Sequence, residues 1–358
     1  MKIIQVLPSL AFGDAIGNHV LALKELFQNL GYDTEIYAEA IDQRLPENTA
    51  FQIQKLPKLD KTDILLYHLS TGTRLNALIA RVECRKIVQY HNITPPYFFG
   101  GYNLRAKRNA EWGLSGARYL ADKVEIIWAD SEFNKNDLRT MGYQQEIDVL
   151  PILIPFEDYE KRPSEKIMEL YNDEAVNLLF TGRIAPNKKQ EDVIKAFFYY
   201  KNYINPKSRL FLVGKYTGLE RYYEKLQEYV QVLNLTDVYF TGHIPFDEIL
   251  AYYRIANGFI CMSEHEGFCV PLVEAMYFGI PILAYASSAI PETLKTAGIL
   301  VKEKEPKLIA EWIDRIVTDA ALNSYLKTQQ KQRLKELGYE VVAQKYRENI
   351  TRFIEGMK

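Results

Sequence analysis

Cysteine is scarce in this chain, and its spacing limits the class of protein. The 358 residues include three cysteines, Cys84, Cys261 and Cys269, which lie far apart or in apolar surroundings and form no Cys-x-x-Cys pair. Disulfide frameworks of small secreted domains need many regularly spaced cysteines. The sequence therefore favours a reducing compartment over a disulfide framework.

Long apolar runs and a strong charge of one sign are also absent. No stretch approaches the ~20 apolar residues that a membrane-spanning helix needs. The first residues, Met1 to Pro8, are too short for a signal peptide and are typical of a buried strand. The formal net charge of −2 gives no support to a nucleic-acid partner. We expect a cytoplasmic protein, with peripheral contact at the inner face of a membrane left open.

Strands and helices alternate along the first part of the chain. The expected strands are Ile3–Leu7, Thr34–Ala38, Asp63–Tyr67, Lys86–Tyr90 and Glu125–Ala129. The first of them leads through the polar loop Gly13–Gly17 into a helix from Asn18 that Gly31 ends. Such alternation predicts a doubly wound parallel sheet.

The same alternation restarts in the second part. The expected strands are Val176–Phe180, Arg209–Val213, Asp237–Phe240, Gly258–Met262 and Ile280–Tyr285. The charged stretch Phe156–Asp173 contains no strand and suits a linker, whereas the tail from Lys307 is helical. The chain is too long for one core, so we expect two domains of Rossmann-like α/β architecture, 1–155 and 174–338. Ligands of such sheets bind at the carboxyl ends of the strands.

The eight-residue step from Glu266 to Glu274 is the most informative local feature. It places one carboxylate in a glycine-containing loop and a second one turn into the following helix. Pro271 suits the first helical position, and Gly279 ends the helix. A helix start attracts anions, while carboxylates accept hydrogen bonds from hydroxyls. The combination fits a nucleotide sugar, although acidic residues are also common in a first helical turn for structural reasons.

Two cations follow the first strand of the second part. Arg183 and Lys188 lie in the loop Thr181–Gln190, at a strand's carboxyl end. Arginine grips phosphate oxygens in a bidentate manner, and lysine adds a mobile charge. Either residue alone is most simply a solvated loop side chain, but both together, beside the two glutamates, indicate a diphosphate site.

A series of motifs gives the chain a family resemblance. In order, they are Thr-Gly-Arg-Ile-Ala-Pro-Asn-Lys from Thr181, Phe-Thr-Gly-His-Ile from Phe240, Glu-Gly-Phe-Cys-Val-Pro-Leu-Val-Glu-Ala from Glu266, Ile-Pro-Glu-Thr from Ile290 and Ala-Gly-Ile-Leu-Val from Ala297. The series resembles the C-terminal half of the retaining glycosyltransferases of family 4, or group 1. The resemblance implies a GT-B fold, in which two Rossmann-like domains face a central cleft and a helix at about 339–358 crosses back to the first domain.

The resemblance also implies roles for individual residues. Arg183 and Lys188 would hold the donor phosphates, Glu266 the sugar hydroxyls, and His91 the sugar near its reacting carbon. Glu274 would bind the ribose, and Gly13 and Asp14 would approach the diphosphate or sugar. The other residues expected to bind the donor are Gly182, His243, Ile244, Gly267, Phe268, Cys269 and Val270.

Three alternatives concern single histidines. His91 could instead satisfy a buried carbonyl group. His19, expected in the first turn of its helix, and His68, at a strand end, could line the cleft or serve structure alone. No Asp-x-Asp dyad or trusted metal-ligand spacing occurs, so we expect neither a metal nor another cofactor.

The expected reaction is metal-independent transfer of a sugar from a nucleotide diphosphate with retention of configuration, the leaving diphosphate taking the acceptor's proton. The loop motifs at Gly13 and His91 favour GDP-mannose over a UDP-linked sugar, and a glycan or lipid-linked acceptor in surface polysaccharide synthesis. Three rivals are a non-catalytic nucleotide-sugar-binding partner subunit, a GT-B epimerase and a dinucleotide-dependent oxidoreductase. The first loop lacks the Gly-x-Gly-x-x-Gly that the oxidoreductase needs.

Overall fold

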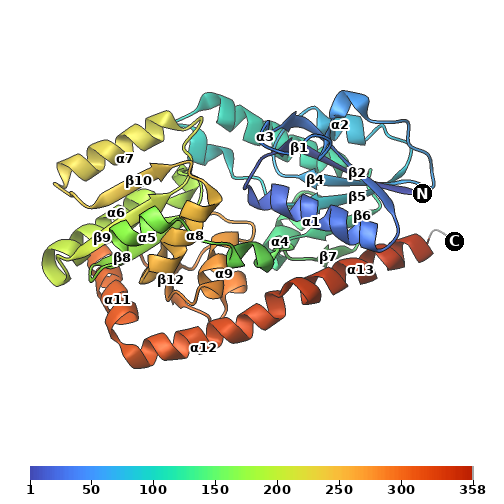
Figure 1. Ribbon diagram of the computed structural model, residues 1–358. Coiled ribbons are helices and arrows are strands. Elements are labelled where there is room, and N and C mark those ends of the chain that lie inside the picture. Colours follow the sequence, from blue (N-terminus) through green and yellow to red (C-terminus); the bar gives the residue numbers. More distant parts are fainter. Residues whose placement is uncertain (357–358) are drawn as a thin grey trace. The chain divides into compact units, whose positions relative to one another are not determined.

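The computed structural model describes residues 1–356, which divide into two units that are each built around a parallel sheet (Figure 1). Unit 1 comprises Met1–Pro96, Lys107–Phe156 and the segment from Leu337. Unit 2 comprises Tyr97–Ala106 and Glu157–Glu336.

The sheet of unit 1 has seven strands in the order β3-β2-β1-β4-β5-β6-β7. Their bounds are β1 Lys2–Leu10, β2 Asp33–Ile41, β3 Phe51–Gln52, β4 Ile64–Leu69, β5 Arg85–Tyr90, β6 Ile126–Ala129 and β7 Ile147–Val149. All neighbouring pairs are parallel. The central strands are buried along almost their whole length, as expected for a parallel sheet that helices cover on both faces.

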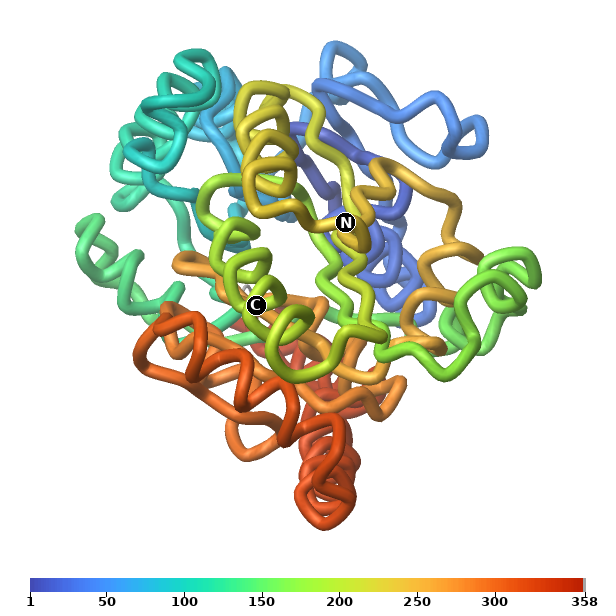
Figure 2. The backbone as a smooth tube through the Cα atoms, turned by 90° about the vertical axis from the view of Figure 1, so that its left-hand side faces the viewer, coloured from blue at the N-terminus to red at the C-terminus, as the bar shows by residue number. Residues whose placement is uncertain are grey.

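The helices of this part of the chain are α1 Ala15–Asn29, α2 Leu75–Ile79, α3 Leu104–Leu120, α4 Glu132–Thr140 and α13 Tyr339–Glu355. The last helix belongs to unit 1 although it ends the sequence. Its apolar residues recur at helical spacing on one face, and Val342, Tyr346 and Ile350 pack in the same cluster as Phe27 and Trp128. Figure 2 follows the trace from another side, with α11 to α13 at its red end.

The sheet of unit 2 has six parallel strands in the order β10-β9-β8-β11-β12-β13. They are β8 Val176–Thr181, β9 Ser208–Val213, β10 Val238–Gly242, β11 Gly258–Cys261, β12 Ile282–Tyr285 and β13 Ile299–Val301. The helices are α5 Glu165–Tyr171, α6 Gln190–Tyr199, α7 Glu220–Val232, α8 Phe246–Ile255, α9 Val270–Tyr277, α10 Ile290–Leu294, α11 Pro306–Thr318 and α12 Ala320–Leu337.

Both sheets reverse their winding at one place. In unit 1 the chain moves outward from β1 to β3 and then returns to β4 on the other side of β1. In unit 2 it moves from β8 to β10 and returns to β11 beside β8. Ligands of doubly wound sheets bind at such switch points, because the two strands' following loops diverge there.

The ten strands expected from the sequence are all present, with shifts at their ends. Three short strands, β3, β7 and β13, were not expected. The stretch 156–173, expected to be a linker, instead contains α5. Ile167 of this helix is buried in the core of unit 2, and Met168 and Tyr171 pack against it, so a short apolar face outweighs the surrounding charge.

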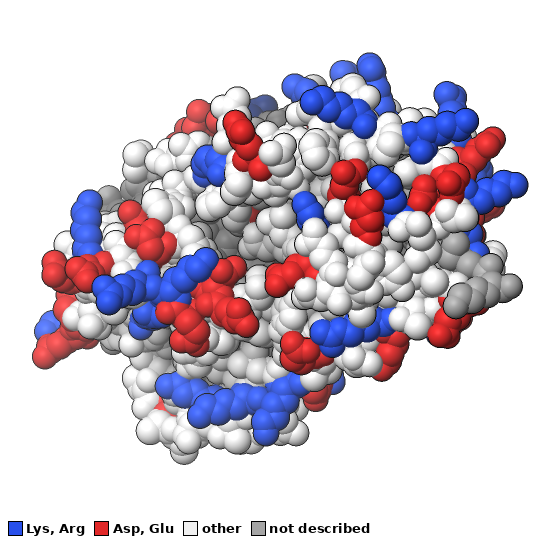
Figure 3. Space-filling model, turned by 45° about the vertical axis from the view of Figure 1, so that its right-hand side comes forward, with Lys and Arg blue, Asp and Glu red and all other residues white. Residues whose placement is uncertain are grey.

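The surface bears charges of both signs. On the face that Figure 3 shows, lysine and arginine side chains are interspersed with aspartate and glutamate. Within residues 1–356, none of the helices combines the length and apolar character that crossing a bilayer requires.

Candidate active site

The loops that follow β8 and β11 meet at the switch point of unit 2. The backbone N–H of Glu264 donates to the carbonyl of Asn187 at 2.8 Å. The side-chain amide of Asn187 in turn donates to the carbonyl of His265 at 3.0 Å. These bonds fix the loop carrying Lys188 against the loop carrying Glu266.

Lys188 and Glu266 form a largely buried ion pair. The ammonium Nζ lies 2.6 Å from both carboxylate oxygens, and the two side chains are 20% and 8% exposed. Burial would by itself lower the pKa of Lys188, but attraction to Glu266 and to the nearby Cys269 raises it overall. Lys188 is therefore charged, and Glu266 keeps unused lone pairs for hydroxyl donors.

Arg183 points to a different neighbour. Its Nη2 donates to the carbonyl of Thr217, in the loop after β9, at 3.2 Å. Its own carbonyl accepts from Gln190 Nε2 at 3.1 Å. Gly182, with φ of 133°, precedes it. The two cations that the sequence groups in one loop thus contact different strand-end loops.

Glu274 lies in α9 between two tyrosines. Tyr253 donates its hydroxyl to Oε2 at 2.6 Å and Tyr159 donates to Oε1 at 3.1 Å. Tyr253 also contacts the hydroxyl of Thr181, at the end of β8, at 2.5 Å. The carboxylate can accept further hydrogen bonds, as binding of a ribose would require.

Burial raises the pKa of Glu274 above its ordinary value of 4.5, although the bonds from Tyr253 and Tyr159 oppose this. Because the folded pKa is the higher one, the free energy of unfolding should fall as pH rises from 4.5 through that pKa. We expect Glu274→Gln to lack this fall, so its stability relative to the parent protein increases between about pH 4 and about pH 7. Urea unfolding at the two pH values measures the difference in the free energy of unfolding between the variant and the parent protein, and Glu228→Gln on α7 is the control. An unchanged difference would contradict the expectation.

The start of α9 differs slightly from the expectation. The helix begins at Val270, which makes Pro271 its second residue rather than its first. Cys269 precedes it in the left-handed conformation, with φ of 72°. Thr293 donates to the carbonyl of Phe268 at 2.5 Å and holds the loop that includes Gly267. Of the two residues after β10, His243 is exposed and Ile244 packs against the core.

The first strand-end loop of unit 1 has the geometry that a close backbone approach needs. Gly13 has φ of 71°, and an added Cβ would meet no atom within 4 Å. Asp14 precedes α1, and its carbonyl accepts from the N–H of Asn18 at 2.9 Å. The roles predicted for Gly13 and Asp14 in donor binding stay predictions.

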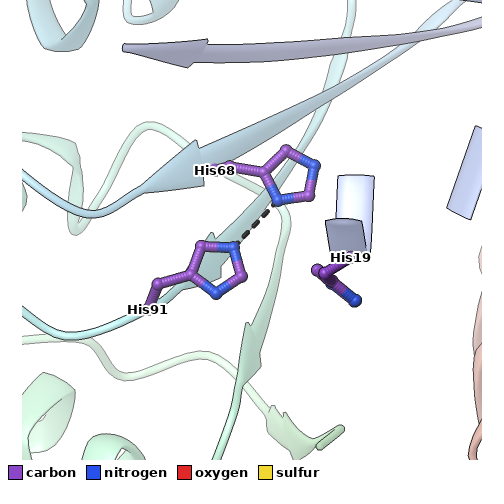
Figure 4. Close-up of side chains that lie close together, drawn as sticks. All are labelled: His19, His68 and His91. Carbon is purple, nitrogen blue, oxygen red and sulfur yellow. Dashed lines mark hydrogen bonds between the residues drawn. The ribbon is translucent and has the colours of Figure 1, made fainter. Parts of the chain in front are cut away.

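Three histidines of unit 1 lie together at its own switch point (Figure 4). The expectation that His19 lies in the first helical turn is wrong, since α1 begins at Ala15 and places it in the second turn, fully buried. The N–H of Leu153 donates to His19 Nδ1 at 3.0 Å, so His19 Nε2 carries the proton and donates to Gln89 at 3.0 Å. Burial, followed by repulsion from His91, lowers the pKa of His19 to about 3.

The partners of His68 determine its tautomer too. Gln5 donates its amide to the carbonyl of Val20 at 3.0 Å, so its Oε1 accepts from His68 Nε2, also at 3.0 Å. His68 Nδ1 is then an acceptor, and His91 Nε2 must donate to it across 2.9 Å. His91 Nδ1 lies 2.8 Å from Asp130.

This network occupies both ring nitrogens of His91, whose side chain is 1% exposed. Gln89 links the network to α13, because its amide donates to Asp130 at 3.1 Å and to Tyr346 at 2.6 Å. The role predicted for His91 at the donor sugar stays a prediction. Asp130 had no predicted role, yet it follows β6 as His91 follows β5, and β5 and β6 are neighbours.

Comparisons with known proteins fit this arrangement. Residues 162–333 match the family described as glycosyl transferases group 1. This match covers most of unit 2 and confirms the predicted resemblance to the group 1 glycosyltransferases.

Two curated relatives are similar at low identity. The O-antigen chain mannosyltransferase B of Escherichia coli is 24% identical over 204 residues, 55% of this chain and 53% of that protein. The lipopolysaccharide 1,2-N-acetylglucosaminetransferase of Salmonella typhimurium is 28% identical over 249 residues, 67% of this chain and 63% of that protein. The matched part thus spans less than two thirds of either relative.

A solved structure is similar over both units. The Anabaena protein Alr3699/HepE, crystallised in complex with UDP-glucose, has a TM-score of 0.79 at 16% identity and covers 98% of this chain and 100% of its own. Together with the two doubly wound sheets, this likeness confirms the predicted GT-B fold.

Proposed function

We propose that the protein is a retaining hexosyltransferase that moves a sugar from a nucleotide diphosphate to a glycan or lipid-linked acceptor in surface polysaccharide synthesis. The observation that carries the proposal is the Lys188–Glu266 pair at the switch point of unit 2, beside the helix that bears Glu274. The mannosyl and N-acetylglucosaminyl transfers named for the two curated relatives, and the UDP-glucose bound by Alr3699/HepE, support it.

The charges and positions of the site's side chains suggest a role for each of them in the proposed sugar transfer. Lys188 and Arg183 would stabilise the leaving diphosphate, as preorganised cations do where negative charge develops. Glu266, which Lys188 contacts at 2.6 Å, would accept hydrogen bonds from sugar hydroxyls, and Glu274 would accept them from the ribose. The departing diphosphate would itself take the proton of the acceptor hydroxyl, so we assign no nucleophile. These cations supply the charge stabilisation, and we propose that no metal is required.

The donor is tested by thermal stabilisation of the protein with UDP, GDP and ADP and their sugar conjugates, without added metal. We expect selective stabilisation by one nucleotide, with GDP favoured by the loop motifs of unit 1. Arg183→Ala and Glu274→Ala should abolish the stabilisation, whereas Arg221→Ala and Glu228→Ala, exposed on α7, should keep it. Stabilisation by none of the nucleotides, or equal stabilisation of all variants, would refute the donor site.

A product assay separates the remaining readings. The preferred nucleotide sugar is incubated with glycan and lipid-linked acceptors, and nucleotide release and products are followed. Transfer with retained anomeric configuration is expected. Conversion of the donor to its epimer would identify an epimerase, and binding without any product across the acceptors would identify a non-catalytic partner subunit.

A further inference from the structure

Two of the three cysteines lie in contact beside the candidate donor site. Cys261 ends β11, and Cys269 directly precedes α9. Their sulfur atoms lie within 4.8 Å of each other, and Cys261 donates to Ser263 Oγ at 3.4 Å. The fold brings them together because the loop between the strand and the helix returns to its starting point through the left-handed backbone of Cys269.

Glu266 completes a group of three ligand atoms. Both cysteine sulfurs and one Glu266 oxygen lie within 4.8 Å of one another, and the three residues are 1%, 6% and 7% exposed. Tetrahedral zinc bonds of about 2.3 Å to sulfur and about 2.0–2.2 Å to oxygen place the ligand atoms about 3.6–3.8 Å apart, so the present atoms would approach one another by at most about 1 Å. The geometry therefore suits a single small cation.

We propose that Cys261, Cys269 and Glu266 form a binding site for one thiophilic divalent cation such as Zn²⁺ or Cd²⁺. Thiolates select soft and borderline cations over Mg²⁺ and Ca²⁺, which prefer oxygen. Three protein ligands leave a fourth tetrahedral position for water or another small donor. This site shares Glu266 with the proposed donor site, but the diphosphate chemistry proposed above assigns no role to a metal.

Lys188 makes the charges of the site balance. With both thiols protonated, the only charges of the metal-free site are those of the Lys188–Glu266 ion pair. Binding replaces the two thiol protons by the cation: both S–H bonds break, two cation–sulfur bonds form, and two protons go to solvent. The dication and Lys188 then neutralise two thiolates and one carboxylate. One Glu266 oxygen can bind the cation while the other keeps Lys188.

The other candidate cluster in the described residues lacks this capacity. His19, His68 and His91 also lie close enough to share an ion. However, each of their ring nitrogens already has a hydrogen-bond partner within unit 1. A cation would have to displace several of these buried bonds, and each buried group left unpaired would cost about 1–3 kcal/mol.

The test is a titration of the reduced full-length protein with Cd²⁺ alone, followed by the ultraviolet charge-transfer band of cadmium thiolates. A thiol count of three in denaturant first establishes that every cysteine is reduced. We expect one ion per chain, with two protons released into a weak buffer at neutral pH. The Glu266→Gln variant should bind Cd²⁺ at least about 10-fold more weakly. Even the loss of a group that only contacts a metal ligand weakens metal binding by about that factor.

Matched cysteine variants decide which sulfurs bind. Cys261→Ser and Cys269→Ala should each abolish the tight band, while Cys84→Ser, in unit 1, should leave it unchanged; circular dichroism verifies that each variant is folded. No tight band from the reduced protein, or a band that survives loss of Cys261 and Cys269, would overturn the proposal. Since no nucleotide is present, failure here leaves the proposed transferase function unaffected.

Discussion

Lys188→Met is expected to lower the free energy of unfolding by about 3–5 kcal/mol, because it leaves the Glu266 carboxylate buried without its partner. The ammonium contacts both carboxylate oxygens at 2.6 Å, and the carboxylate side chain is 8% exposed. The same substitution should lower the rate of sugar transfer about 10²–10³-fold if Lys188 stabilises the leaving group as an oxyanion donor does.

Urea unfolding of a double-mutant cycle separates the pair energy from other effects. The variants are Lys188→Met, Glu266→Gln and their combination, and the combined variant should recover much of the stability lost in Lys188→Met. Lys189→Met is the matched control. Lys189 pairs with Glu264 at 3.3 Å, but the side chains of Lys189 and Glu264 are 26% and 35% exposed. Such surface pairs contribute about 0–1 kcal/mol. Equal losses in Lys188→Met and Lys189→Met would show that the buried pair is not stabilising.

Much of the fold could be predicted because local patterns determine it. Apolar runs of four to six residues separated by helices suffice to identify ten strands, and the order of parallel sheets then places Arg183, Lys188 and Glu266 at neighbouring strand ends. The strands β3, β7 and β13 were not predicted from the sequence because they contain only two or three residues each. Runs so short carry no periodicity, and only pairing with a neighbouring strand defines them.

The interactions of the site were harder to predict, since they depend on tertiary contacts. His91 meets Asp130 39 positions away, and Gln89 meets Tyr346 257 positions away. The cysteines were predicted to lie far apart or in apolar surroundings, and Cys261 and Cys269 are indeed buried in the hydrophobic core of unit 2, but their closeness to each other was not predicted. Eight positions separate them, a spacing with no signal of its own, yet one strand end and one helix start bring their sulfurs into contact.

Gly214→Ala is expected to be as damaging as loss of the buried ion pair. Gly214 follows β9 with φ of 155°, and a Cβ built there would lie 1.9 Å from the carbonyl oxygen of Gly182 and 2.7 Å from its carbon. Both atoms are backbone, so no flexible side chain can give way. Overpacking costs about 1–3 kcal/mol, and a residue forced into a rare backbone region costs about 1–3 kcal/mol more. We expect a total loss of stability of about 2–6 kcal/mol.

The clash should also affect the proposed phosphate contact of Arg183, because Gly182 directly precedes Arg183. Moving its carbonyl displaces the arginine that contacts Thr217 beside the same loop, so nucleotide binding should weaken even where the variant still folds. Gly242→Ala is the matched control: it also has a positive φ, 69°, but its built Cβ meets no atom within 4 Å. Urea unfolding and nucleotide-induced thermal stabilisation of both variants measure the difference. Gly214→Ala and Gly242→Ala could instead lose equal stability and nucleotide binding. The positive φ alone would then explain both losses, and the close approach of the two loops would not position Arg183.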